Sequence, residues 1–202
     1  MLQGGALFLS ACHGLSEVRA SRTLIETPHP DAWHPVLRAL IPTVLPFEHP
    51  AFPPVTVDAL FDELEQLFPI ESDPAFAALP KALMLFDDCP LFETAPPPFV
   101  DDQRVDLAES RVPAAAIDVA VEQAQAYERA LWQAYTARFG SARFTAQPLP
   151  AQRAYLALYS HSELVARRRF YRGMKALVTI TAYSTTPFWK AVGYEGPLLR
   201  RG

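Results

Sequence analysis

Residues 163–197 read ELVARRRFYRGMKALVTITAYSTTPFWKAVGYEGP and carry the longest helical pattern in the chain. At about 100° per residue, apolar positions repeat along one side of a helix and basic residues along the other. The apolar side comprises Phe170, Tyr171, Met174, Leu177, Val178 and Thr181, and the basic side Arg168, Arg169, Arg172 and Lys175. The pattern predicts an amphipathic helix of about five turns.

A short second helix is predicted directly after the long one. Thr186 suits the N-cap, Pro187 the first helical position and Gly193 the left-handed position after the helix end. Residues 188–192 therefore form a helix in this interpretation. A turn at 194–197 follows, because Gly tolerates positive φ and Pro ends regular hydrogen bonding.

Composition limits the fold and the function. The 202 residues suit one domain. With a net charge of −4, the chain lacks the positive electrostatic potential that nucleic-acid binding requires. The one dense basic cluster, Arg167 to Arg172, is read as a solvated helix face rather than a polyanion site. No run reaches the roughly 18 to 20 apolar residues of a membrane span.

Twenty prolines separate the apolar segments, which indicates short helices joined by stiff connectors. Asp31 is a candidate N-cap for a helix over 32–45, which Pro35 and Pro42 should restrict to the interval between them plus a first turn. Thr56 is the candidate cap of a helix over 57–68, where apolar residues repeat at helical spacing.

The middle of the chain contains a further helix and a long loop. Ser72-Asp73-Pro74 should begin a helix that runs to about Phe86 and is kinked or divided at Pro80. Residues 88–113 show little periodicity and are the longest predicted loop, either a disordered excursion or an ordered arm that wraps a partner.

Strong helical periodicity returns over 114–139 and ends at Gly140. A shorter helix is predicted over 152–160, and Ser162 should cap the long C-terminal helix. The predicted buried face of the 114–139 helix comprises Ile117, Ala120, Val121, Ala124, Tyr127, Leu131 and Tyr135. Strand signals are nearly absent, so the sequence predicts an all-α, single-domain irregular helical bundle with proline-rich connectors.

Linear motifs for catalysis or cofactor binding are missing from the sequence. There is no glycine-rich dinucleotide or phosphate loop, no nucleophile elbow and no CxxC pair. Glu26 and His29 have the ExxH spacing of di-iron bundles, but Pro28 disrupts the helix that would align them. No metal site is predicted, and His29, His34 and His49 are expected to lie exposed in connectors.

Two charged residues interrupt apolar helix faces. Arg167 falls on the side of Phe170 and Met174, and Glu128 falls near Val121 and Ala124. One interpretation is that both side chains snorkel at the edge of the core. The other is a buried Arg–Glu pair that fixes how the two long helices pack.

The C-terminal region carries a signature of aromatic, arginine and glycine residues. Its members are Arg169, Phe170, Tyr183, Ser184, Trp189, Gly193, Tyr194, Gly196 and Pro197. This ending resembles the gluconate 2-dehydrogenase subunit 3 family, the small subunits of flavin-dependent GMC-type (glucose–methanol–choline) oxidoreductases. A second similarity is the segment Leu37-Arg38-Ala39-Leu40-Ile41-Pro42, which resembles the family's early helix ending in an Ile-Pro step. Together the matches cover about a third of the chain.

The resemblance implies a non-catalytic subunit that binds, and helps to export, a GMC-type flavoprotein large subunit. FAD would belong to that partner and no cofactor to this chain, and a cytochrome c subunit is a further candidate partner. Large aromatics and an arginine near the C-terminus are typical interface anchors. The predicted partner-binding residues are Phe188, Trp189, Tyr194, Pro197, Leu198 and Arg200.

Residues 1–12 are interpreted as the remnant of an export or lipoprotein signal, followed by a helical domain over 13–202. Leu9-Ser10-Ala11-Cys12 resembles a lipobox, although the positive segment of a signal peptide is missing. Lipidation of Cys12 would tether the chain to the periplasmic face of the inner membrane and leave Cys89 without a disulfide partner. An ordinary frayed N-terminus is the alternative interpretation.

Two other functional classes stay open at this point. The chain could be a free-standing helical ligand-binding protein or enzyme whose site assembles from distant residues, since a missing linear motif is weak evidence. It could also be a lipoprotein scaffold without an oxidoreductase partner. The substrate of any complex cannot be read from this sequence.

Overall fold

The computed structural model describes residues 31–88 and 97–191. These residues form helices and no strand, so the predicted all-α class is confirmed for the described part of the chain. Two short 3-10 helices, η1 (Pro74–Phe76) and η3 (Phe144–Ala146), join the main elements. The α-helices are α2 (His34–Val44), α3 (Val57–Leu67), α4 (Leu79–Asp88), α5 (Pro97–Glu109), α6 (Ala114–Phe139), α7 (Leu149–His161), α8 (Val165–Ser184) and α9 (Thr186–Ala191).

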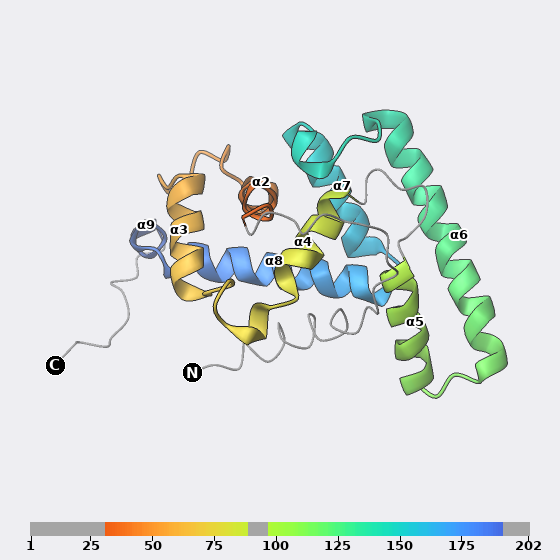
Figure 1. The fold of residues 1–202 in the computed structure, drawn as a ribbon. Coiled ribbons are helices and arrows are strands. Elements are labelled where there is room, and N and C mark those ends of the chain that lie inside the picture. Colours follow the sequence, from red (N-terminus) through yellow and green to blue (C-terminus); the bar gives the residue numbers. More distant parts are fainter. Residues whose placement is uncertain (1–30, 89–96, 192–202) are drawn as a thin grey trace.

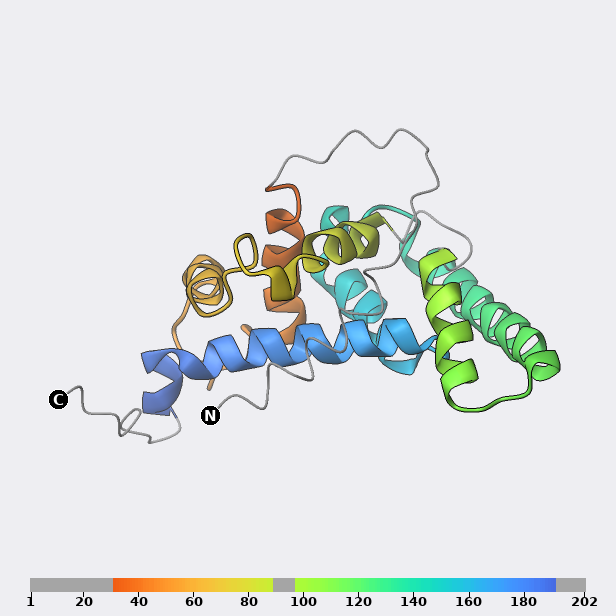
Figure 2. The ribbon, with the colours of Figure 1, turned by 60° about the horizontal axis from the view of Figure 1, so that its bottom comes forward.

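Helix α8 is the axis of the molecule, and α2, α3, α5, α7 and α9 all contact it. Figures 1 and 2 show α9 and α3 at its C-terminal end and the α5–α6 pair at its N-terminal end. Its buried side includes Phe170, Met174, Leu177, Val178 and Thr181, as the apolar pattern predicted. Burying such a face is the main source of stability for a helix in water.

An aromatic cluster centred on Phe86 joins four elements in the core. Its ring centroid lies 4.8 Å from that of Phe170 on α8 and 4.7 Å from that of Phe144 on η3. Tyr155 and Tyr159 of α7 lie 5.2 and 4.9 Å away. Because offset and edge-to-face rings attract one another beyond their burial, the cluster fixes α4 and α7 against α8.

The predicted limits of α2 are wrong at both ends. Asp31 is not the N-cap, because Trp33 occupies that position and makes no side-chain cap. The helix also continues past Pro42 to Val44, although a proline removes one backbone donor. Arg153 of α7 compensates for the exposed helix end, because its Nη2 donates to the carbonyls of Pro42 (3.1 Å) and Leu45 (3.4 Å).

The start signals of the next two helices are confirmed. Thr56 Oγ1 accepts a hydrogen bond from Ala59 N at 3.1 Å and caps α3. Asp73 caps η1 through Ala75 N at 2.8 Å. The helix predicted up to Phe86 is divided, as one alternative stated, because α4 begins at Leu79 with Pro80 in its first turn.

The predicted loop over 88–113 is wrong for its second half, where α5 forms. This helix packs on α6 and α8 through polar contacts instead of an apolar stripe. Gln103 Oε1 accepts from Val165 N at 2.8 Å, and Arg169 of α8 pairs with Asp106 at 2.9 Å. Residues 89–96 lie outside the described residues, so the proposed partner-wrapping arm stays a prediction there.

Helix α6 has the predicted bounds, but its buried face is rotated from the predicted one. Val121, Ala124 and Tyr135 are buried as expected, whereas Tyr127 is 43% exposed. Trp132, which the prediction left out, is buried and stacks on Tyr135 at 5.6 Å. Gly140 ends the helix with φ of 80°, a conformation that favours glycine.

Candidate functional site

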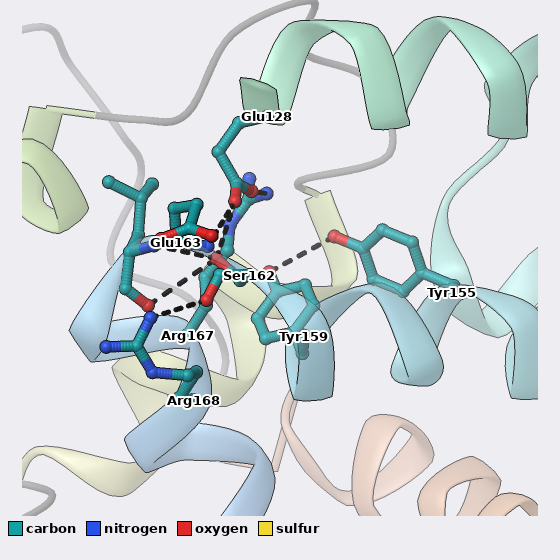
Figure 3. A network of polar contacts seen from close by, with 8 residues as sticks. Glu128, Tyr155, Tyr159, Ser162, Glu163, Arg167 and Arg168 are labelled. Carbon is teal, nitrogen blue, oxygen red and sulfur yellow. Dashed lines mark hydrogen bonds and ion pairs between the residues drawn. The ribbon is translucent and has the colours of Figure 1, made fainter. Parts of the chain in front are cut away.

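A buried ion pair joins the two long helices. Glu128 of α6 is 3% exposed and Arg167 of α8 is 9% exposed, and Arg167 Nη1 donates to Glu128 Oε2 (Figure 3). The Arg167 guanidinium also lies 5.1 Å from the ring centroid of Tyr159. The prediction of a buried pair is therefore confirmed, and the snorkelling alternative is wrong.

The same carboxylate organises the start of α8. Glu128 Oε1 accepts from Ser162 Oγ at 2.8 Å and from Glu163 N at 2.9 Å. Ser162 Oγ in turn accepts from Leu164 N at 3.0 Å, and Figure 3 shows this network at the α7–α8 junction. The prediction that Ser162 is the N-cap of α8 is wrong, because Leu164 occupies that position. The network satisfies backbone donors that a helix start leaves without partners, so it is a structural device.

Phe188 and Trp189, the two predicted partner-binding residues in the described part of the chain, lie beyond the opposite end of α8. Only Thr185 separates α8 from α9, and its carbonyl accepts from the amides of Phe188 (3.2 Å) and Trp189 (3.3 Å). Thr185 therefore occupies the N-cap position that the sequence assigned to Thr186. The chain turns sharply here and brings α9 against the end of α8 (Figure 2).

Phe188 packs into the protein's own core. It is 8% exposed, and its ring lies 5.2 Å from Phe52 and 5.7 Å from Tyr183. Trp189 is partly buried, and its Nε1 donates to the carbonyl of Tyr183 at 2.5 Å. Of these two predicted partner-binding residues, Trp189 retains the more accessible surface.

The other predicted site residues fall outside the described part of the chain. They are Cys12, Tyr194, Pro197, Leu198 and Arg200. Their roles in lipidation and partner binding stay predictions, as does the absence of a disulfide involving Cys89.

Apolar side chains remain exposed where α8 meets α9. Ile180 is 44% exposed and Tyr183 is 55% exposed, and their spacing of three residues places them on one side of α8. We call Ile180, Tyr183, Pro187, Trp189 and Ala191 the C-terminal surface. Ile180 was not predicted to be a site residue. Its helical-wheel position lies outside the predicted buried side of the helix, and this position could have predicted its exposure.

A largely apolar hollow adjoins this surface. Pro54, Thr186, Pro187, Lys190 and Ala191 line it, and its volume is about 490 Å³. Lys190 is the one charged side chain among these lining residues.

The structure confirms one of the three histidine predictions and contradicts another. His49 is exposed as expected, and His29 lies outside the described residues. The prediction for His34 is wrong, because His34 is the first residue of α2 and is partly buried. Its Nε2 lies 3.3 Å from Glu65 Oε1 and 3.5 Å from Glu71 Oε1, so α3 and the turn after it contribute carboxylates to this histidine.

Two carboxyl groups have shifted acidities. Burial raises the pKa of Asp102 on α5 to about 6, although the nearby Arg169 opposes this shift. The hydrogen bond from Arg153 lowers the pKa of exposed Glu48 to about 2. Asp102 lies on α5 and Glu48 in the turn after α2, so neither belongs to the elements of the C-terminal surface.

Comparison with known proteins found no match for the chain among family models, curated proteins or solved structures. Among the described residues, no helix combines the length and the apolarity that crossing a bilayer requires.

Proposed function

We propose that the chain is the non-catalytic small subunit of a periplasmic or membrane-associated GMC-type flavin-dependent dehydrogenase complex. In this proposal the large subunit holds FAD and carries out the oxidation. The small subunit binds it and assists its export. A cytochrome c subunit is a further partner, and a lipid on Cys12 would supply the membrane attachment.

The observation that carries the proposal is the exposed apolar C-terminal surface. Ile180 and Tyr183 project from the end of a helix that the core holds firmly. The hydrogen bond from Trp189 to Tyr183 and the burial of Phe188 fix α9 beside them. Rigid aromatic and aliphatic groups lose little entropy on binding, so they suit a stable interface.

The resemblance supports the choice of partner. Three of the resembling residues, Tyr183, Ser184 and Trp189, lie at this surface or beside it. The other two described residues of the C-terminal match contribute to the fold, because Phe170 is buried and Arg169 pairs with Asp106. The sequence signature thus combines residues that position α8 with residues at the proposed interface.

Co-expression with a GMC-type flavoprotein encoded beside this chain tests the proposal. The flavoprotein should co-purify with the tagged chain in stoichiometric amount, measured by flavin absorbance. Ile180→Glu should weaken binding at least tenfold, because it places a charge in an apolar interface. Val119→Glu on α6 is the matched control, since Val119 is 53% exposed and α6 lies beyond the other end of α8 (Figure 1).

Two results would contradict the proposal. One is the failure of any such flavoprotein to co-purify with the wild-type chain. The other is equal loss of binding in the Ile180 and Val119 variants, which would place the interface elsewhere or show a general loss of solubility. Circular dichroism of each variant verifies that helix content is unchanged.

A further inference from the structure

Four side chains with metal-binding chemistry converge at the start of α2. Ligand atoms of Asp31, His34 and Glu71 all lie within 4.8 Å of one another. Glu65 of α3 adds a further carboxylate, whose Oε1 lies 3.3 Å from His34 Nε2. Asp31 and His34 come from the α2 start, Glu65 from α3, and Glu71 from the turn before η1.

The imidazole of His34 is held firmly in this cluster. Trp33 packs edge-on against it with ring centroids 4.2 Å apart, and Phe61 does so at 5.2 Å. Nε2 is shielded from solvent, and no hydrogen bond satisfies it within the described part of the chain. Buried imidazole nitrogens almost always have a partner, so this atom points to a ligand at the cluster.

The spacing of the cluster fits a metal ion better than a hydrogen bond. Nε2 lies 3.3 and 3.5 Å from the two glutamate oxygens, whereas N–H···O bonds are about 2.7–3.2 Å long. Ligands bound tetrahedrally at the usual zinc distances of about 2.0–2.2 Å are about 3.3–3.6 Å apart. The separations of Nε2 from the two glutamate oxygens fall in this range, and ligand atoms of Asp31, His34 and Glu71 lie within 4.8 Å of one another.

We propose that His34, Asp31 and Glu71 bind a divalent transition-metal ion, with Glu65 as an additional carboxylate ligand. One imidazole nitrogen with carboxylate oxygens is a donor set that Zn²⁺, Mn²⁺ and Fe²⁺ accept. The ion would join the start of α2 to α3 and the turn at Glu71. This role lies outside the proposed partner binding, because the C-terminal surface shares none of these residues.

A protonated His34 between Glu65 and Glu71 is the competing explanation. Three carboxylates around one imidazolium leave a local charge of −2, whereas a divalent ion with neutral imidazole leaves −1. The metal therefore balances the cluster better and also gives Nε2 a direct bond. The two explanations make opposite predictions for Zn²⁺ binding, so one titration separates them.

The test is isothermal titration of the tag-free full chain with Zn²⁺ at pH 7.5, after treatment with a chelator. The proposal requires one ion per chain, loss of binding in His34→Ala and at least tenfold weaker binding in Glu71→Gln. His49→Ala is the control, because His49 is exposed and is not among the clustered ligand residues. Excess Mg²⁺ should not compete, since it prefers six oxygen ligands.

The Glu71 variant keeps the test decisive if His34→Ala disturbs the packing of Trp33 and Phe61. Glu71 is 59% exposed, so Glu71→Gln should retain the wild-type circular dichroism. Zn²⁺ binding that is absent in the wild type, or unchanged in both cluster variants, overturns the proposal. Loss of binding in His49→Ala alone overturns it as well.

Discussion

Arg167 and Glu128 lie 39 residues apart in sequence and form an ion pair inside the protein. Each charge would be costly in the core alone. The Glu128 carboxylate also accepts from the Ser162 hydroxyl and the Glu163 amide, and the Arg167 guanidinium also lies over the Tyr159 ring. The pair connects α6 to α8 where Ser162 and Glu163 link α7 to α8. Three helices therefore share one carboxylate.

Removing one partner of this pair should destabilise the protein strongly. Arg167→Met leaves Glu128 buried without its cation, and the expected loss in the free energy of unfolding is about 3–5 kcal/mol. Urea denaturation followed by circular dichroism measures it. The double variant Arg167→Met with Glu128→Leu should lose less than the sum of the single variants. Additive losses would show that the two side chains act independently.

The pKa of Asp102 predicts a stability change with pH. Burial raises this pKa from 3.8 to about 6, so the folded state binds a proton that the unfolded state has released between these values. This contribution is fully present below pH 3.8 and is lost as pH rises to about 6. Asp102→Asn should stabilise the protein at pH 7 by about 1 kcal/mol, a value reduced because solvent screens the half-exposed group.

Thermal unfolding of wild type and Asp102→Asn between pH 4 and 7 measures this difference. The difference between the melting temperatures of Asp102→Asn and wild type should increase as pH rises. Asp62→Asn on α3 is the control, because Asp62 is an exposed carboxylate on another helix. A difference in melting temperature that stays constant across this pH range would contradict the raised pKa of Asp102.

Sequence periodicity predicted the elements that bury apolar faces. In α8 the positions of Phe170, Leu177 and Val178 repeat at helical spacing, and the structure buries them. Helix α5 was missed because its contacts with α6 and α8 are polar, and Gln103 and Asp106 produce no apolar period. Apolar patterns thus reveal packing only where packing is apolar.

Local rules failed where a distant residue changed their outcome. Pro42 was expected to end α2, but Arg153, 111 residues away, binds the helix end. The buried pair was predictable because Arg167 and Glu128 interrupt apolar faces of their own helices. His34 gave no such signal, since its carboxylate neighbours come from another helix and from a turn that the sequence does not align with it.

The contact between Arg153 and the end of α2 predicts an acid-sensitive stabilisation. Arg153 pairs with Glu48 and lowers the pKa of that carboxyl from 4.5 to about 2. The contribution of Glu48 to stability is present above pH 4.5 and is lost as pH falls to about 2. Glu48→Gln should therefore destabilise the protein at pH 6 and differ little from wild type near pH 2.

Arg153→Lys should also destabilise the protein, because a lysine cannot reach Glu48 and the carbonyls of Pro42 and Leu45 together. Thermal melts from pH 2 to 6 test both variants. Arg172→Lys on α8 is the control, because this exposed arginine carries the same charge. Equal melting temperatures for Arg153→Lys and wild type would exclude this bracing role.

The C-terminal residues 194–202 provide the last test of the proposed interface. Tyr194, Pro197, Leu198 and Arg200 follow α9, and a soluble chain rarely carries an aromatic residue and two leucines there without covering them. Deleting 194–202 should leave the helix content unchanged, because the described core ends at α9. It should weaken binding to the co-expressed flavoprotein at least tenfold. A truncated chain that co-purifies at full yield would exclude these residues from the interface, and one that aggregates without the partner would assign them to the core.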